Sequence, residues 1–199
     1  EEEEEHEHEH GEEEHETHET LTPDEHVWTS PENAIAIVEQ IAEVLGELDP
    51  EQTAVYEENE KAYVSLLEEL DDEFREVVSS AKRDVLLFGD RFPFRYMADD
   101  YDLKYYAAFA GCSAETMAGF ETVTFLAKKA DELQLPVILT IENSDGRIAE
   151  AVKSNTTKKN QKILAMNSLQ SVTKEQLADG ITYLQVMQEN LSVLSEALN

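Results

Sequence analysis

Several residue types are scarce in this chain, and each scarcity excludes a class of protein. The 199 residues include 45 acidic but only 15 basic side chains, a formal net charge of −30, so the cations that a nucleic-acid surface needs are missing. Adsorption on an anionic membrane is disfavoured for the same reason. The longest apolar runs are only a few residues, so none could cross a bilayer. Cys112 is the only cysteine, which excludes an intrachain disulfide and a cysteine-rich zinc site.

Histidine is absent after His26, and this limits the chemistry of most of the chain. A serine or cysteine nucleophile with a histidine base is excluded from residues 27–199, so we interpret Cys112 as a small buried residue. The glycine-rich dinucleotide and phosphate-binding motifs are also missing. We therefore expect no catalytic residues. The chain opens on glutamates without an initiator Met and without a visible signal peptide, which predicts that it begins inside a longer protein.

Residues 1–20 form a low-complexity tract of Glu and His that cannot build a core. In an extended segment the alternation places His6, His8 and His10 on one face, and His15 and His18 follow. Neutral imidazole binds zinc, copper and nickel, and the surrounding carboxylates concentrate cations. The tract is predicted to bind divalent transition metals without fixed geometry. The alternative interpretation is a solvated acidic linker or an expression tag.

Two helices follow the tract. Ser30-Pro31-Glu32 is typical of a helix start, and apolar residues then recur at helical spacing through residue 48. Asp49-Pro50-Glu51 begins a second helix in the same way, which is predicted to run from about 50 to 80. If the upstream part of the protein is missing, one apolar stripe of the first helix should be partly exposed; it consists of Ile35, Val38, Ile41 and Leu45.

The remaining chain alternates short apolar runs with helical segments, which predicts an α/β fold with a four-stranded parallel sheet flanked by helices. The expected strands are Val85–Phe88, Tyr105–Phe109, Val137–Ile141 and Ile163–Met166. The expected helices lie at 93–101, 114–134, 146–155 and 173–198, with Thr173 and Gln176 spaced as a capping box. Ligands bind at the carboxyl edge of such sheets. The side chains predicted at that edge are Asp90, Cys112, Glu142 and Asn167.

Three of the candidate metal ligands have strong structural alternatives. His26 precedes a capped helix and lies beside Trp28, and a lone histidine is commonly structural. Asp90 and Glu142 offer oxygen ligands, but acids near helix starts also serve as caps. Asp90 could equally pair with Arg91 or Arg95.

The order of these features resembles the substrate-binding proteins of bacterial zinc and manganese ABC transporters. The resemblance rests on the His-rich acidic loop (6–18), on Asp24-Glu25-His26-Val27-Trp28-Thr29-Ser30-Pro31-Glu32-Asn33-Ala34, on Tyr56-Glu57-Glu58-Asn59 in the long helix, and on Tyr183-Leu184-x-x-Met187-x-x-Asn190-Leu191. It covers essentially the whole chain.

The resemblance implies two α/β lobes joined by a rigid helix, with a metal ion in the cleft between them. On this basis, residues 1–20 are the His/Glu loop, 21–49 the end of the first lobe, 50–82 the linking helix, and 83–199 the second lobe. The rest of the first lobe would lie upstream, and the Trp28 loop would lie near the carboxyl edge of the sheet.

The resemblance also implies metal ligands. His26 matches the family's second ligand. Gly89 stands at the position of the family's third ligand, so Asp90 could substitute for that ligand only with a shift of one residue. Asn167 stands at the position of the fourth ligand and offers a neutral carbonyl oxygen. Glu142 matches an acid near the cleft that supports the site. Two of the four places thus depart from the family pattern, which indicates an altered site, weaker binding or a different metal.

The function that follows is that of a non-enzymatic, extracytoplasmic receptor that binds Zn²⁺, or else Mn²⁺, and delivers it to an ABC transporter permease. The imidazole-rich loop favours zinc, and binding should weaken below about pH 6, where imidazole is protonated. Two alternatives remain open at this point. One is a Mg²⁺-dependent α/β enzyme that uses Asp90 and Glu142, and the other is a metal buffer or chaperone that acts through the tract alone.

Overall fold

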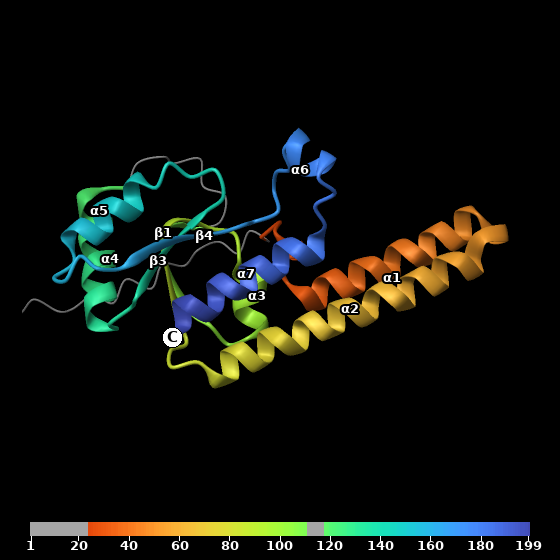
Figure 1. Cartoon of the computed structure of the whole chain (residues 1–199), viewed down its shortest axis with the longest axis horizontal. Helices are drawn as coiled ribbons and strands as arrows, with labels where there is room; N and C mark the ends of the chain where they lie inside the picture. The colour runs from red at the N-terminus through yellow and green to blue at the C-terminus, as the bar shows by residue number, and fades with distance from the viewer. Residues whose placement is uncertain (1–23, 111–117) are drawn as a thin grey trace, which may run out of the picture.

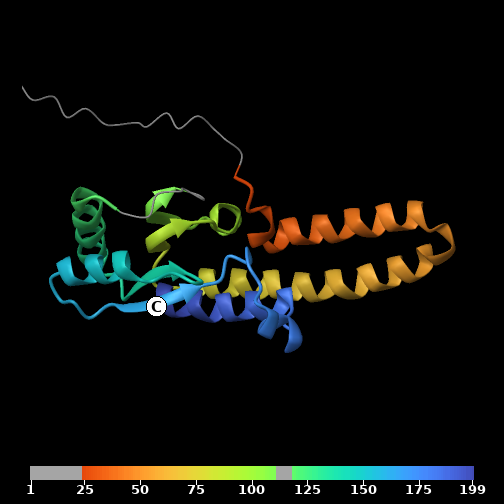
Figure 2. The same ribbon diagram turned by 90° about the horizontal axis from the view of Figure 1, so that it is seen from above.

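The structure, a computed structural model, describes residues 24–110 and 118–199. A helical hairpin extends from an α/β unit, as Figures 1 and 2 show. The described helices and strands follow one another as η1 (Val27–Thr29), α1 (Pro31–Leu48), η2 (Pro50–Gln52), α2 (Thr53–Ser80), β1 (Val85–Phe92), α3 (Arg95–Asp100), β2 (Lys104–Ala110), α4 (Phe120–Glu132), β3 (Val137–Ile141), α5 (Arg147–Asn155), β4 (Lys162–Met166), α6 (Lys174–Ala178) and α7 (Tyr183–Leu198).

The strands form a single sheet in the order β2-β1-β3-β4, and every neighbouring pair is parallel. This confirms the predicted four-stranded parallel sheet. Successive side chains of β1 point to opposite faces, which gives the sheet two cores. Leu86 and Phe88 pack beneath α2, α3 and α7, whereas Val85 and Leu87 pack beneath α4 and α5.

The hairpin consists of α1 and α2 running side by side (Figure 1). As predicted, the Ser30 hydroxyl caps α1 by accepting a hydrogen bond from the Asn33 N–H at 2.9 Å, with Pro31 in the first turn. The buried side chains of α2, Leu67, Leu70 and Phe74, all lie in its second half, where the helix crosses the α/β unit. The apolar stripe of α1 is partly exposed, as the sequence predicted.

One predicted helix is wrong. The segment expected as a single helix over 173–198 is two helices, α6 and α7. Gly180 adopts the left-handed conformation, with φ at +74°, and this ends the first helix. Thr182 and Gln185 then form a capping box that starts the second. The predicted capping box of Thr173 and Gln176 is confirmed at the start of α6.

The strand β1 is longer than predicted, and its extension matters for the site. The sequence placed Gly89 and Asp90 after a strand that ends at Phe88, but both lie within β1. Phe88 pairs with Ala107 while Arg91 pairs with Phe109, so β1 carries one extra residue in a β-bulge. Gly89 allows α5 to approach closely, since a Cβ at this position would lie 2.5 Å from the Ala149 Cα.

Candidate metal centre

His26 lies at the entrance to η1 and is only 1% exposed. Its Nδ1 is 2.6 Å from Oδ1 of Asp24, and the same oxygen accepts the His26 backbone N–H at 2.9 Å. The carboxylate therefore holds the imidazole in the tautomer with hydrogen on Nδ1, which leaves the lone pair on Nε2. This is the arrangement in which a histidine binds a metal through Nε2.

The loop that carries the histidine is held against the α/β unit by long-range hydrogen bonds. The Trp28 indole N–H donates to the Ser168 carbonyl at 2.9 Å, and the Tyr183 hydroxyl donates to the Trp28 carbonyl at 2.9 Å. The Tyr96 hydroxyl donates to the Asp24 carbonyl at 2.8 Å. Burial raises the pKa of Tyr183, so its hydroxyl stays a donor. Because Ser168 is the second residue after β4, the loop lies beside the carboxyl edge of the sheet, as expected.

Gln170 is the residue that reasoning from the sequence missed. Its side-chain amide nitrogen contacts Nε2 of His26. The two residues line one cavity of about 490 Å³ together with Glu25, Trp28 and Leu169. Half a turn of the carboxamide about its last bond would present the oxygen in place of the nitrogen. Gln170 therefore occupies the place from which a second ligand would reach an ion bound to His26.

A second cavity, also of about 490 Å³, opens at the carboxyl edge of the sheet. Asp90, Glu142 and Gln170 all line it, so the structure brings two of the predicted acids together, and Gln170 joins both cavities. The remaining lining residues are Gly89, Arg91, Phe109, Ile141, Asn143, Ser144, Asp145, Ile148 and Ser171.

Asp90 lies in the bulge of β1 and is 6% exposed. Its Oδ1 accepts the backbone N–H of Arg91 at 2.9 Å, and its Oδ2 accepts the hydroxyl of Ser144. The nearest guanidinium nitrogen of Arg91 is 4.0 Å from Oδ1, whereas Arg95 pairs with Asp99. The acid is thus buried, with a hydrogen-bond donor on each of its two oxygens.

Glu142 follows β3 and braces the segment after β4. Its two oxygens accept the backbone N–H and the hydroxyl of Ser168, at 2.7 and 2.6 Å. The carboxylate therefore fixes the residue whose carbonyl receives the Trp28 indole, two positions before Gln170. Through these two bonds Glu142 fixes Ser168 and so acts on the turn that carries Gln170.

Asn167 lies apart from these acids. It lines a third cavity, of about 290 Å³, that includes Trp28 and Tyr183 but neither Asp90 nor Glu142. Its side-chain oxygen accepts the Leu169 N–H at 2.8 Å, and its backbone N–H donates to the Asn190 side chain at 2.7 Å. These bonds shape the turn that presents Gln170.

The other predicted metal contacts, His6, His8, His10, His15 and His18, lie outside the described residues, as does Cys112. Among residues 24–110 and 118–199, one group of at least three His, Cys, Asp or Glu side chains has its potential ligand atoms within 4.8 Å of one another: Asp24, Glu25 and His26. Together with Gln170 and Asp90, this segment offers imidazole nitrogen and oxygen ligands, a donor set that suits zinc.

Comparisons with known proteins show which family the chain belongs to. A family model described as the periplasmic zinc-uptake complex component A matches residues 1–197. The high-affinity zinc uptake system protein ZnuA of Bacillus subtilis is 31% identical over 175 residues, which are 88% of this chain and 53% of that protein. The zinc-binding lipoprotein AdcA of Streptococcus pneumoniae is 33% identical over 173 residues, 87% of this chain and 34% of that protein.

Solved structures share the fold. The metal-dependent lipoprotein YcdH of Bacillus subtilis has a TM-score of 0.76 at 28% identity, over 88% of this chain and 65% of that one. The Zn(II)-bound ZnuA-like domain of S. pneumoniae AdcA has a TM-score of 0.72 at 30% identity, over 88% and 64%. The chain spans about half the length of ZnuA from Bacillus subtilis and about a third of the length of AdcA from Streptococcus pneumoniae. In the part of the chain that the structure describes, none of the helices has the length and apolar character to span a bilayer.

Proposed function

Because the chain belongs to the family of the periplasmic zinc-uptake complex component A, we propose that it acts as the extracytoplasmic zinc-binding component of a metal ABC transporter. The relatives are named for zinc uptake and zinc binding, and one is a lipoprotein, which supports transport rather than catalysis. The observation that carries the proposal is the position of His26: its Nδ1 is engaged by Asp24, and its Nε2 contacts Gln170, a residue that lines both cavities.

In this proposal the ion is the cargo, and the residues hold it as follows. His26 supplies Nε2, the Gln170 carboxamide turns to supply its oxygen, and Asp90 supplies a carboxylate from the adjoining cavity. Glu142 acts through Ser168, which it fixes beside Trp28. Gln170 replaces Asn167 as the residue after β4 that we assign to the ion, since Asn167 lines another cavity. A neutral amide is a weaker zinc ligand than a carboxylate, so we expect modest affinity.

The cleft extends beyond the described residues in this proposal. The exposed apolar stripe of α1 and the partial coverage of the relatives support a further lobe that packs on α1 and closes over the ion. Delivery to a permease belongs to the same proposal. The tract with His6, His8, His10, His15 and His18 would concentrate zinc near the site, because its imidazoles and carboxylates attract divalent cations.

The test is a zinc titration of the full chain followed by the fluorescence of Trp28, the only tryptophan, whose ring centroid is 5.5 Å from that of His26. A saturable change in emission is expected, and His26→Ala should abolish it. His18→Ala is the matched control, since it removes one imidazole from the tract and should leave the Trp28 response intact. Gln170→Glu should tighten the response and Gln170→Leu weaken it. An unchanged response in His26→Ala would refute the proposed site.

The contribution of the tract is tested separately. Calorimetry of the full chain should show additional weak zinc sites that disappear when residues 1–20 are removed, while the Trp28 response remains. Loss of the Trp28 response on this truncation, with no effect of His26→Ala, would instead support a metal buffer that acts through the tract. Turnover that requires Mg²⁺ would support the enzyme interpretation.

A further inference from the structure

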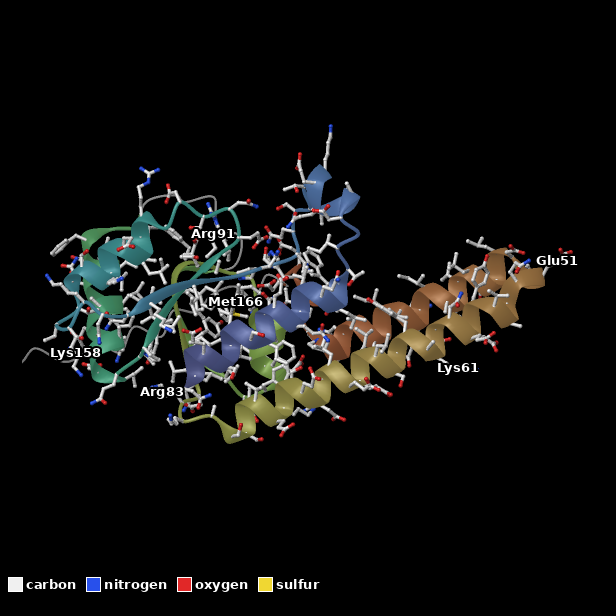
Figure 3. All side chains as sticks on the ribbon, in the orientation of Figure 1. Glu51, Lys61, Arg83, Arg91, Lys158 and Met166 are labelled. Carbon is white, nitrogen blue, oxygen red and sulfur yellow. The ribbon has the colours of Figure 1, made fainter. Side chains whose placement is uncertain are left out.

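We propose that Arg91 is a built-in counter-ion of Asp90 that competes with the incoming metal ion and so sets the affinity of the site. This inference rests on the proposed function, because it concerns the same carboxylate. It starts from an unusual feature of the cavity at the sheet edge: a site meant for a divalent cation is lined by a guanidinium. In Figure 3 Arg91 lies at this edge of the sheet, near the segment between β3 and α5.

The acidic side chains of this cavity differ in the groups that they contact. Asp145 is engaged by Arg147, whose Nε lies 2.6 Å from its carboxylate. Glu142 accepts two hydrogen bonds from Ser168. Asp90 is left as the buried acid that faces a positive charge inside the cavity, with Nη1 of Arg91 4.0 Å from its Oδ1.

The chain geometry holds the two charges together. The bulge of β1 places Asp90 and Arg91 in succession, and the Arg91 backbone N–H donates to the same Oδ1 that the guanidinium approaches. The Arg91 side chain is 29% exposed and that of Asp90 only 8%, so the arginine reaches the water from which the carboxylate is shielded. Metal binding at Asp90 would then require that the guanidinium move away, and the free-energy cost of that exchange would weaken the affinity for the ion.

The charges of the three residues assigned to the ion also indicate that Arg91 opposes metal binding. His26 and Gln170 are neutral ligands, and the single negative charge of Asp90 is offset by the single positive charge of Arg91. A divalent ion that approaches Asp90 is therefore repelled by the guanidinium of Arg91 until that side chain moves away. At separations of a few ångströms inside a protein, one removed positive charge changes the binding of a divalent ion substantially.

The experiment compares Arg91→Gln with Arg147→Gln in the full chain, using zinc sulfate as the ligand and Trp28 fluorescence as the readout. Both variants remove one positive charge near the same cavity, but Arg147 faces Asp145 instead of Asp90. Arg91→Gln should lower the Kd by about tenfold or more, and Arg147→Gln should change it by less than about twofold. The gain should shrink as the salt concentration rises, because the removed interaction is electrostatic.

Two further variants secure the conclusion. Arg91→Lys keeps the charge and should stay close to the wild-type Kd, which separates the effect of charge from that of side-chain shape. Asp90→Asn combined with Arg91→Gln should lose the gain, because the shared carboxylate is gone. Circular dichroism checks that each variant is folded.

The outcomes separate this inference from the proposed function. If Arg91→Gln binds zinc no more tightly than the wild type while His26→Ala still abolishes the response, the counter-ion role is refuted and the zinc site stands. If His26→Ala leaves the response unchanged, the proposed function fails, whatever Arg91→Gln does. Equal gains in Arg91→Gln and Arg147→Gln would refute a specific role for Arg91 and indicate a general effect of net charge.

Discussion

The helical hairpin and the α/β unit differ in both charge and packing. Residues 31–80 carry 15 acidic and 2 basic side chains, a net charge of −13, whereas residues 81–199 carry 16 acidic and 13 basic, a net charge of −3. In Figure 3 the acidic Glu51 lies at the tip of the hairpin, and the basic Lys158 lies at the opposite end of the molecule. Ile41 and Leu48 of the hairpin are 53% and 78% exposed, while Phe88 of the sheet is fully buried. Stability thus resides in the α/β unit, and the hairpin keeps an apolar face for other contacts.

The largest expected effect is on the free energy of unfolding, for a substitution in the buried half of α2. Phe74 is fully buried and stacks on Tyr101, with 5.4 Å between the ring centroids. Phe74→Ala should lower the free energy of unfolding by about 3–5 kcal/mol, since it removes buried apolar surface and leaves a cavity. Leu66→Ala in the same helix, at a side chain that is 47% exposed, is the control and should cost much less. Equal losses in urea unfolding would contradict the division between hairpin and α/β unit.

A smaller effect is expected where β1 meets α5. Gly89→Ala would place a Cβ 2.5 Å from the Ala149 Cα, so the helix must move away from the strand at a cost of about 1–3 kcal/mol. The shift would also disturb the bulge that holds Asp90, so the affinity for zinc should fall. Gly119→Ala is the matched control, because a Cβ there meets nothing within 4 Å. Thermal unfolding and zinc titration of both variants measure the difference.

The sequence predicted the framework well, because the sheet follows from local patterns. Four apolar runs bounded by turn residues gave the four strands, and the run Val137–Ile141 matches β3 residue for residue. The capped start of α1 and the length of α2 followed from Pro31 and Pro50. The sequence contains the signals for the break between α6 and α7, which are Gly180 and a second capping box after it. The prediction missed the break because apolar residues recur at helical spacing on both sides of it.

The site was harder to predict, because it depends on contacts between distant residues. Gln170 lies 144 positions from His26, and a glutamine carries no metal-binding signal of its own. The bulge that brings Asp90 into β1 results from pairing with β2, whereas glycine and aspartate argue locally against a strand. His26 was singled out because its neighbours form a motif, and the structure shows that Asp24 within that motif is its hydrogen-bond partner.

A still smaller effect is expected at the junction between the two regions, where Asp100 has one buried oxygen without a hydrogen-bond partner in the described residues. Burial, with the nearby charges of Glu32 on α1 and Asp71 on α2, raises the pKa of this acid, against the opposing effects of the Ser30 hydroxyl and Arg75. A folded-state pKa above the unfolded value means that the contribution of Asp100 to stability is greatest at low pH and is lost as the pH rises through the folded pKa.

Asp100→Asn should therefore raise the Tm at pH 7.5, by about 2 °C, and leave it nearly unchanged at pH 4. Tyr101 and Tyr183 also face this region, but burial raises the pKa of each, so both stay neutral over this range. Asp102→Asn, an exposed acid just beyond the same helix, is the control and should show no such pH dependence. A lower Tm for Asp100→Asn at pH 7.5 would mean that the charged carboxylate stabilises the junction.

The smallest effect is expected on the open face of the hairpin. Ile41→Ser combined with Leu48→Ser should change the free energy of unfolding by no more than about 0.5 kcal/mol, because both side chains are largely exposed. The hairpin's net charge of −13 should keep two copies apart, so sedimentation should give a monomer for the wild type and the variant alike. Binding of a hydrophobic dye should fall in the variant, since apolar surface is lost. A loss of stability above 1 kcal/mol, or a wild-type dimer that the substitutions dissociate, would show that this face is already covered and that the hairpin is not the open region described above.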